Sequence, residues 1–227
     1  MRTDEILQTM LMYLILPLWL AAGFSDYLCH RAAHIERTSG WPESVLHLLE
    51  MAEMAIPVMA ALFLEINAAV ILLMIVCFLL HQATALWDLY YAAATREVGP
   101  IEQHVHSFLE MIPLMGLLLV VALHWDQFIS LFGFASPRFD FVLKPRPLPW
   151  IYVATVLGAA VIFEILPYLE ELWRGWRARR ATRQSPVRLQ ELPAMADIER
   201  WGTLTIGTGL GNAQFRNRPG RIERKRG

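Results

Sequence analysis

The sequence predicts an all-α membrane protein: a polytopic bundle of about five transmembrane helices, with a metal-binding core formed by four of them. Of its 227 residues 56% are hydrophobic and only 18% are charged, whereas soluble domains carry about 25% charge. The charges are also divided along the chain. Residues 1–173 hold 7 of the 20 basic and 17 of the 21 acidic residues, a net charge of −10, and residues 174–227 carry +9. This profile is typical of polytopic membrane proteins, which contact membrane lipids, and excludes a soluble protein that binds nucleic acid.

Five apolar stretches are long enough to cross about 30 Å of hydrocarbon. They lie near residues 6–28, 45–64, 68–92, 103–124 and 149–172. We therefore expect two regions, a transmembrane bundle over residues 1–175 and a basic cytoplasmic tail over residues 176–227.

Turn signals separate these stretches. Ser39-Gly40-Trp41-Pro42 divides the first two, Glu65-Ile66-Asn67 is a tight turn, and Val98-Gly99-Pro100 is a stop followed by a helix start. The fourth connection, about 125–148, contains five phenylalanines. We expect it to lie in the membrane interface.

Basic residues predict the orientation. Arg31, Arg37 and Arg96 lie in the first and third connections. More arginines follow the fifth stretch, at Arg174, Arg177, Arg179, Arg180 and Arg183. The positive-inside rule makes their shared face cytoplasmic, as in a bacterial-type inner membrane, although Arg138, Lys144 and Arg146 in the fourth connection oppose this orientation.

Ionisable side chains recur inside the apolar stretches at helical spacing, where they are costly and usually functional. In the first and fourth stretches they follow an i, i+4, i+8 pattern, which places them on one face of each helix. The predicted metal ligands are Asp26, His30, His34, Glu50, Glu53, His81, Asp88, His106 and Glu110. Four further residues are predicted to support the ligands or to lie beside them: His47, Glu102, His104 and Glu164.

The depth of these residues predicts that they meet. At 1.5 Å rise per residue most lie about 9–17 Å from the cytoplasmic helix ends, and His81 lies deeper at about 21–24 Å. Imidazole and carboxylate groups bind iron, manganese or zinc, and helical bundles build two-metal carboxylate sites from facing helices. Without cations so many buried carboxylates would have to protonate. We therefore predict two iron ions, with zinc or manganese as alternatives.

Each candidate also has a structural interpretation. Asp26 and Glu53 could be protonated hydrogen-bond donors, His34 could simply end its helix, and His47 could be a solvated cap. His104 lies on the opposite helix face from His106, and Glu164 could pair with an arginine or histidine. Five glutamates are interpreted as solvated: Glu36, Glu43, Glu97, Glu170 and Glu171.

The segment His30-Arg31-Ala32-Ala33-His34 resembles the H-x-x-x-H box that membrane-bound, histidine-rich diiron desaturases and hydroxylases carry at a cytoplasmic helix end. The resemblance implies a diiron centre, although the chain has no H-x-x-H-H motif. Carboxylates would therefore replace several of that family's histidines.

The leading functional hypothesis is a membrane-embedded diiron oxidoreductase that uses O2 to hydroxylate or desaturate a lipid or other apolar substrate. The substrate would enter sideways from the bilayer, past candidate lining residues Met51, Met54, Met59, Met111 and Met115. Electrons would come from an external donor protein, for which the Arg-rich tail is a candidate docking site.

Three alternatives remain open. The first is a zinc-dependent intramembrane lipid hydrolase using His30, His81 and His106 with a carboxylate as base. The second is a b-type haem protein that carries electrons. The third is a non-enzymatic membrane subunit, whose buried polar groups conduct protons or fix the helix register.

Overall fold

The computed structural model describes residues 2–184, 213–218 and 221–226. Its bundle begins with a continuous rod made of α1 (Thr3–Met10), the π-helical turn η1 (Leu11–Ile15) and α2 (Leu16–Ala33). The middle elements are the short 3-10 helix η2 (Ile35–Arg37), α3 (Trp41–Phe63), α4 (Ala68–Thr95), α5 (Pro100–Leu123) and the short α6 (Trp125–Ser130). The last rod consists of α7 (Trp150–Ala160), the π-helical turn η3 (Val161–Ile165) and α8 (Leu166–Gln184).

Five helical segments are long and apolar enough to cross a membrane, which confirms the predicted all-α bundle and identifies a membrane-integral protein. They are Thr3–Ala33, Trp41–Phe63, Ala68–Thr95, Pro100–Leu123 and Trp150–Ala181. The last helix continues to Gln184, past the predicted boundary at residue 175, because the sequence has no proline between residues 168 and 185.

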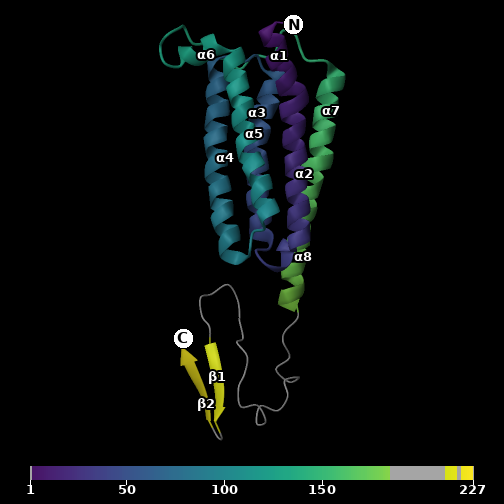
Figure 1. Cartoon of the computed structure of the whole chain (residues 1–227), viewed down its shortest axis with the longest axis vertical. Helices are drawn as coiled ribbons and strands as arrows, with labels where there is room; N and C mark the ends of the chain where they lie inside the picture. The colour runs from purple at the N-terminus through teal and green to yellow at the C-terminus, as the bar shows by residue number, and fades with distance from the viewer. Residues whose placement is uncertain (1, 185–212, 219–220, 227) are drawn as a thin grey trace. The chain divides into compact units, whose positions relative to one another are not determined.

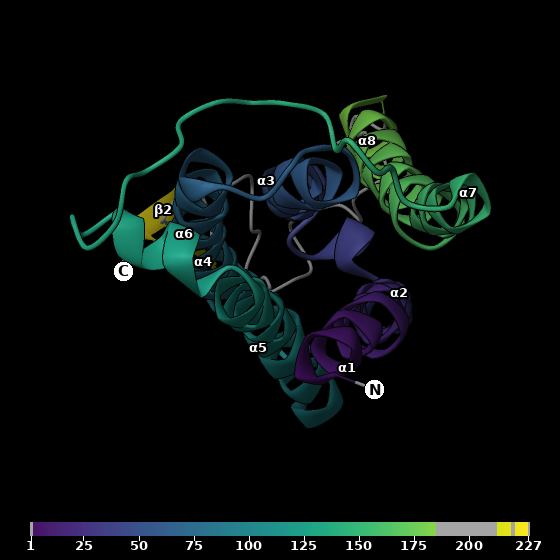
Figure 2. The same ribbon diagram turned by 90° about the horizontal axis from the view of Figure 1, so that it is seen from above.

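The five rods alternate in direction (Figure 1) and surround a common interior when viewed along the bundle (Figure 2). α2 packs against α5, α5 against α4, and α4 against α3, while η3 of the last rod contacts α2. One end of the bundle therefore holds the end of α2, the starts of α3 and α5, and the end of α4. The sequence predicted that the basic first and third connections share a face, and they meet at this end.

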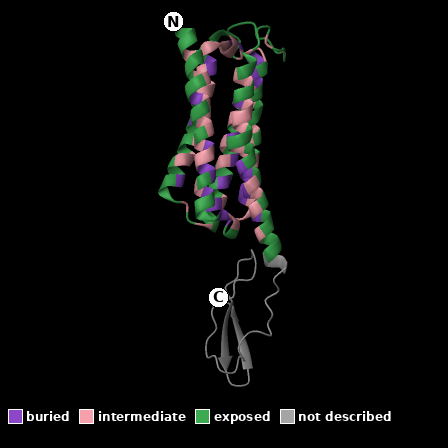
Figure 3. Cartoon of the chain, turned by 90° about the vertical axis from the view of Figure 1, so that its right-hand side faces the viewer, coloured by how far each residue is buried: buried purple, intermediate pink, exposed green. Residues whose placement is uncertain are grey.

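The outward surface of the bundle is apolar. Leu79, Trp87 and Leu118 are each more than half exposed, and exposed residues cover the outer faces of the helices in Figure 3. Away from the polar end, Ala60, Val70, Met74 and Val120 form a buried apolar cluster. Such a surface suits hydrocarbon, because lipid tails can cover apolar side chains and a helix satisfies most of its backbone hydrogen bonds within itself.

At the other end, the fourth connection packs across the turn between α3 and α4. Leu143 forms a β-bridge with Leu64, and the amide of Asn67 donates to the backbone and side chain of Asp140 at 2.7 Å. Four of the five phenylalanines in this segment are 60% or more exposed: Phe132, Phe134, Phe139 and Phe141. This exposure is what a segment in the membrane interface requires.

Lys144 closes the C-terminal end of α3. Its ammonium donates to the carbonyls of Ala61 at 2.6 Å and Leu64 at 2.7 Å, two of the carbonyls that a helix end leaves unpaired. Burial lowers the pKa of this ammonium.

Replacing Lys144 with Met is expected to destabilise the bundle by about 1–3 kcal/mol, because two half-buried carbonyls lose their donor. Thermal unfolding in detergent measures the effect. Lys144→Arg keeps donors in place and should retain most of the stability; equal losses in the two variants would show that the side chain's shape, and not its donor groups, matters.

The chain divides into two units at residues 182 and 183. In the second unit, β1 (Ala213–Arg218) pairs antiparallel with β2 (Arg221–Arg226), with Ala213 opposite Arg226. Together with the last residues of α8, this hairpin is the regular structure described within the predicted tail. Most of residues 185–227, including the glycine-rich stretch 207–211, lie outside the described residues.

Candidate metal centre

Histidine and carboxylate side chains converge at the polar end of the bundle, and every membrane-spanning rod contributes to them. α2 provides Asp26 and His30, α3 provides Glu43 and His47, and α4 provides Asp88. α5 provides Glu102 and His106, and α8 provides Tyr168 and Glu171. All but His106 are buried, and the His106 side chain is 17% exposed. Spacings of three or four residues explain the convergence, because they place both members of each pair on the inward face of their helix.

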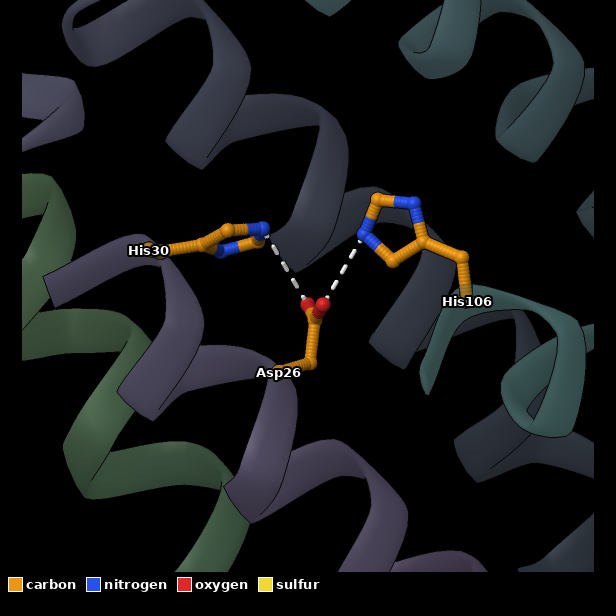
Figure 4. A group of neighbouring side chains, drawn as sticks. All are labelled: Asp26, His30 and His106. Carbon is orange, nitrogen blue, oxygen red and sulfur yellow. Dashed lines mark ion pairs between the residues drawn. The ribbon is translucent and has the colours of Figure 1, made fainter. Parts of the chain in front are cut away.

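The first group is centred on Asp26. Its Oδ1 lies 2.9 Å from His106 Nε2 and its Oδ2 lies 3.4 Å from His30 Nε2, so the carboxylate sits between the two imidazole rings (Figure 4). These three residues can each offer one ligand atom within 4.8 Å of the others. Glu102 Oε1 lies 3.4 Å from His30 Nε2, and the Tyr168 hydroxyl donates to Asp26 Oδ2 at 3.2 Å.

The second group adjoins the first and shares His30. His30, Glu43 and His47 also offer ligand atoms within 4.8 Å of one another. The His30 and His47 rings are stacked, with centroids 4.3 Å apart and planes 12° apart. His47 Nε2 lies 3.5 Å from Asp88 Oδ2 and 4.0 Å from Glu43 Oε1. Because one ring nitrogen can bind one ion at a time, Asp88 is the residue that would complete a site at His47.

Glu171 contacts both stacked rings at Nδ1, on the side away from their Nε2 atoms. Its two carboxylate oxygens accept from His30 Nδ1 at 3.1 Å and from His47 Nδ1 at 2.8 Å. These bonds favour the tautomers in which Nδ1 carries the proton and the Nε2 lone pair is free. Among the described residues, neither Nε2 atom has a hydrogen-bond partner. Each histidine therefore presents an unprotonated Nε2 atom, a possible metal ligand, to the interior of the bundle.

The prediction that Glu171 is solvated is wrong: the residue is 1% exposed. It lies at the predicted end of the fifth apolar stretch, two residues before Trp173, but α8 continues past that point and still buries this side chain in the bundle. The signal that could have found it is its spacing from Glu164 and Tyr168. The three residues lie at i, i+4 and i+7 and so extend one helix face.

Arg96 joins the two groups at the end of α4. Its Nε lies 3.1 Å from Glu43 Oε1 and its Nη1 lies 3.0 Å from Glu102 Oε2, with further contacts from Nη2 to both carboxylates. Burial alone would lower the pKa of the Arg96 guanidinium, but the hydrogen bonds from Glu102 and Glu43 outweigh burial and raise that pKa above its usual value. Glu43, predicted to be solvated, is instead fully buried. From the sequence, Arg96 contributed only to the predicted orientation of the chain in the membrane.

Deeper in the bundle lies a cavity of about 490 Å³. Four predicted ligands or supporting residues line it without belonging to either group: Glu50, His81, Glu110 and Glu164. His81 is 5% exposed, and among the described residues neither of its ring nitrogens has a hydrogen-bond partner. Glu53 instead accepts from the Thr84 hydroxyl at 2.9 Å and does not line this cavity.

Two predicted residues lie away from the centre. His34 adopts a left-handed backbone conformation with φ of 52° and ends α2; its side chain is 64% exposed and lies 3.4 Å from Glu36. His34 therefore lies outside both groups, and the H-x-x-x-H box does not place two histidines side by side. His104 is exposed and packs its ring against Phe108, because it lies on the opposite face of α5 from His106.

An apolar cavity of about 170 Å³ adjoins the polar one, and Trp19 lines both. Of the five methionines predicted to line a substrate slot, Met51 lines the polar cavity and Met54 the apolar one. Met59, Met111 and Met115 line neither cavity and are 43%, 53% and 46% exposed. Their positions fall on the outer faces of α3 and α5.

The net charge of the buried side chains in the two groups indicates whether metal cations would fit there. Five buried carboxylates belong to the two groups, Asp26, Glu43, Asp88, Glu102 and Glu171, against one buried guanidinium, that of Arg96, whose side chain is 3% exposed. With neutral histidines these groups carry a net charge of −4. Two divalent cations would neutralise it, and free Nε2 atoms beside the carboxylates provide ligand types that iron, zinc and manganese accept.

No protein-family model matches the chain, and neither a curated protein nor a solved structure is detectably similar to it. Functional inference therefore depends on the geometry and chemistry of these groups.

Proposed function

We propose that the chain is a membrane-embedded diiron oxidoreductase that uses O2 to hydroxylate or desaturate an apolar, lipid-like substrate. One observation carries the proposal: on facing helices, two stacked histidines are held at Nδ1 by Glu171 and present free Nε2 atoms among buried carboxylates. The net charge of −4 in this cluster supports two divalent cations over one.

The two ions would be held by different residues. His30, His106 and Asp26, with Glu102 beside them, would bind the first. His47 and Asp88, with Glu43 beside them, would bind the second; these carboxylates lie 3.5 Å and 4.0 Å from His47 Nε2. A site with more carboxylate than imidazole ligands favours iron or manganese over zinc.

The reaction needs an electron source outside this chain. Hydroxylation converts substrate, O2, two electrons and two protons to an alcohol and water, and desaturation gives an alkene and two waters. A bound diiron pair would supply the capacity to reduce O2 at this position. The electrons would come from a one-electron donor protein, with the Arg-rich stretch after Trp173 as its docking site.

The side chains of the protein would have three tasks. Glu171 orients His30 and His47, and Arg96 fixes the two carboxylates beside them. Glu50 and Glu110 line the cavity next to the cluster, where their carboxylates would relay the protons that the reaction consumes. The apolar cavity beyond Trp19 would bind hydrocarbon and keep water away from it.

The test is the metal content of detergent-purified protein, with an optical spectrum of the same sample. We expect two irons per chain, a loss of about one iron in His106→Ala, and unchanged content in His104→Ala. The last variant is a matched control, because His104 lies on the same helix but points away from the cluster. One zinc per chain would instead support the hydrolase, and a stable protein free of metal would overturn the proposal.

The ion-pair geometry favours one alternative, a proton-holding network. His30, His47 and His106 each lie within 3.5 Å of a carboxylate. If all three carried protons, the buried charge would fall from −4 to −1 without metal. The hydrolase trio is less well supported, because His81 belongs to neither group. Haem is disfavoured because the stacked His30 and His47 rings leave no gap for a porphyrin between them.

A further inference from the structure

The polar and the apolar cavity adjoin each other, and together they make up the two halves of one candidate path. Their shared lining residue is Trp19, and Met51 and Met54 line the polar and apolar halves one helical turn apart. Along α5 the apolar half extends from Ile112 to Val120, which corresponds to about 12 Å of helix. This shape matches an amphiphile with a head group beside the cluster and one hydrocarbon chain in the bundle interior.

The polar half is acidic beyond what the cations would neutralise. Its lining includes five carboxylates, and among the described residues that line it none is Lys or Arg. Two of the five, Asp26 and Asp88, belong to the ion-binding groups. The other three, Glu50, Glu110 and Glu164, have no cationic partner among the described residues.

Unpaired polar atoms point to a missing ligand in this half. Among the described residues, one carboxylate oxygen each of Glu50 and Glu164 and both ring nitrogens of the buried His81 have no hydrogen-bond partner. Buried polar atoms are normally bonded to protein, water or ligand. A buried carboxylate is especially costly unless a cation or a hydrogen-bond donor accompanies it.

The backbone directs Glu164 into this space. Glu164 lies in η3, and π-helical turns of this kind are frequent at functional sites. Gly23 faces it from α2, where a Cβ would collide with the Glu164 carboxylate. The other π-helical turn, η1, contributes Leu11, Met12 and Ile15 to the apolar half. Both turns in the membrane rods therefore face the path.

We propose that the path binds a single-chain amphiphile with an ammonium head group, a long-chain alkylamine. The ammonium would lie among Glu50, Glu110 and Glu164 and donate hydrogen bonds to their oxygens, and the chain would occupy the apolar half. Fatty acids are disfavoured, because their carboxylate heads would face the carboxylates that line the polar half. That the amine is the substrate rests on the proposed function; that it binds does not.

The test uses a dodecylamine brominated at mid-chain, because bromine quenches tryptophan fluorescence on contact and Trp19 lines both halves. The protein, reconstituted in nanodiscs of zwitterionic lipid, has eight tryptophans, so the Trp19→Phe variant isolates the signal of interest. We expect the brominated amine to quench the fluorescence of the wild-type protein saturably. The saturable component should be absent in Trp19→Phe, and the matching brominated fatty acid should produce no saturable quenching in the wild type.

Charge-removing variants complete the test. Glu50→Gln/Glu110→Gln should weaken amine binding about tenfold or more, since two acceptors of the buried ammonium lose their charge. Glu53→Gln is the matched control, because Glu53 is also half-buried on α3 but bonds Thr84. Equal binding of acid and amine, or an unchanged affinity in the double variant, would overturn the inference. Metal content of the same samples separates the proposals: two irons without amine binding overturn only this one.

Discussion

The Arg96→Gln variant is expected to lose about 3–5 kcal/mol of stability, the usual cost of removing one partner from a buried ion pair. Arg96 is the one buried guanidinium within the described cluster, and its loss leaves Glu43 and Glu102 buried without their counter-charge. Glutamine can donate to one of the two carboxylates but cannot neutralise either. The variant should therefore unfold at a much lower temperature than the wild type.

Thermal or denaturant unfolding in detergent measures this effect. Arg138→Gln is the matched control: Arg138 also pairs with two carboxylates, but its side chain is 48% exposed, and exposed pairs contribute little. Adding Glu43→Gln to Arg96→Gln should recover part of the loss, because the two changes act on one ion pair. Equal stability losses in the Arg96 and Arg138 variants would contradict a stabilising role for the buried ion pairs of Arg96 with Glu43 and Glu102.

The Glu171→Gln variant is expected to bind metal about 10–100-fold more weakly, the range found when a residue that orients a ligand is changed. The glutamate accepts a hydrogen bond from both His30 and His47. A glutamine of nearly the same volume offers only one acceptor oxygen, and its NH2 group opposes the other Nδ1–H. One imidazole would then have to change tautomer and turn its protonated Nε2 toward the ion.

Competition with a chelator of known affinity measures this change, and circular dichroism checks that the helices remain folded. Glu170→Gln is the matched control on the adjacent position, because Glu170 accepts from the Tyr27 hydroxyl and contacts none of the three clustered histidines. Unchanged metal affinity in Glu171→Gln would contradict the role of Glu171 in orienting the two histidines. Equally weakened metal binding in Glu171→Gln and Glu170→Gln would indicate a general disturbance of α8.

The sequence alone predicted the five spans and most of the inward-facing side chains. Apolar length identifies a membrane helix without reference to its neighbours, because the bilayer sets the required number of residues. Spacing along one helix likewise predicts which residues share a face, as it did for Asp26 with His30 and for Glu102 with His106. These inferences are local, and the structure agrees with them.

Only the tertiary structure decided which side chains touch across helices. Glu43 and Arg96 lie at helix ends, and Glu171 lies at the predicted end of the fifth apolar stretch, where sequence position cannot distinguish a solvated charge from a buried one. Neighbouring helices bury these three, and the left-handed end of α2 turns His34 outward although it is four residues from His30. Hydropathy and periodicity describe each helix against the bilayer, whereas pairing depends on the rotation and depth of one helix relative to the next.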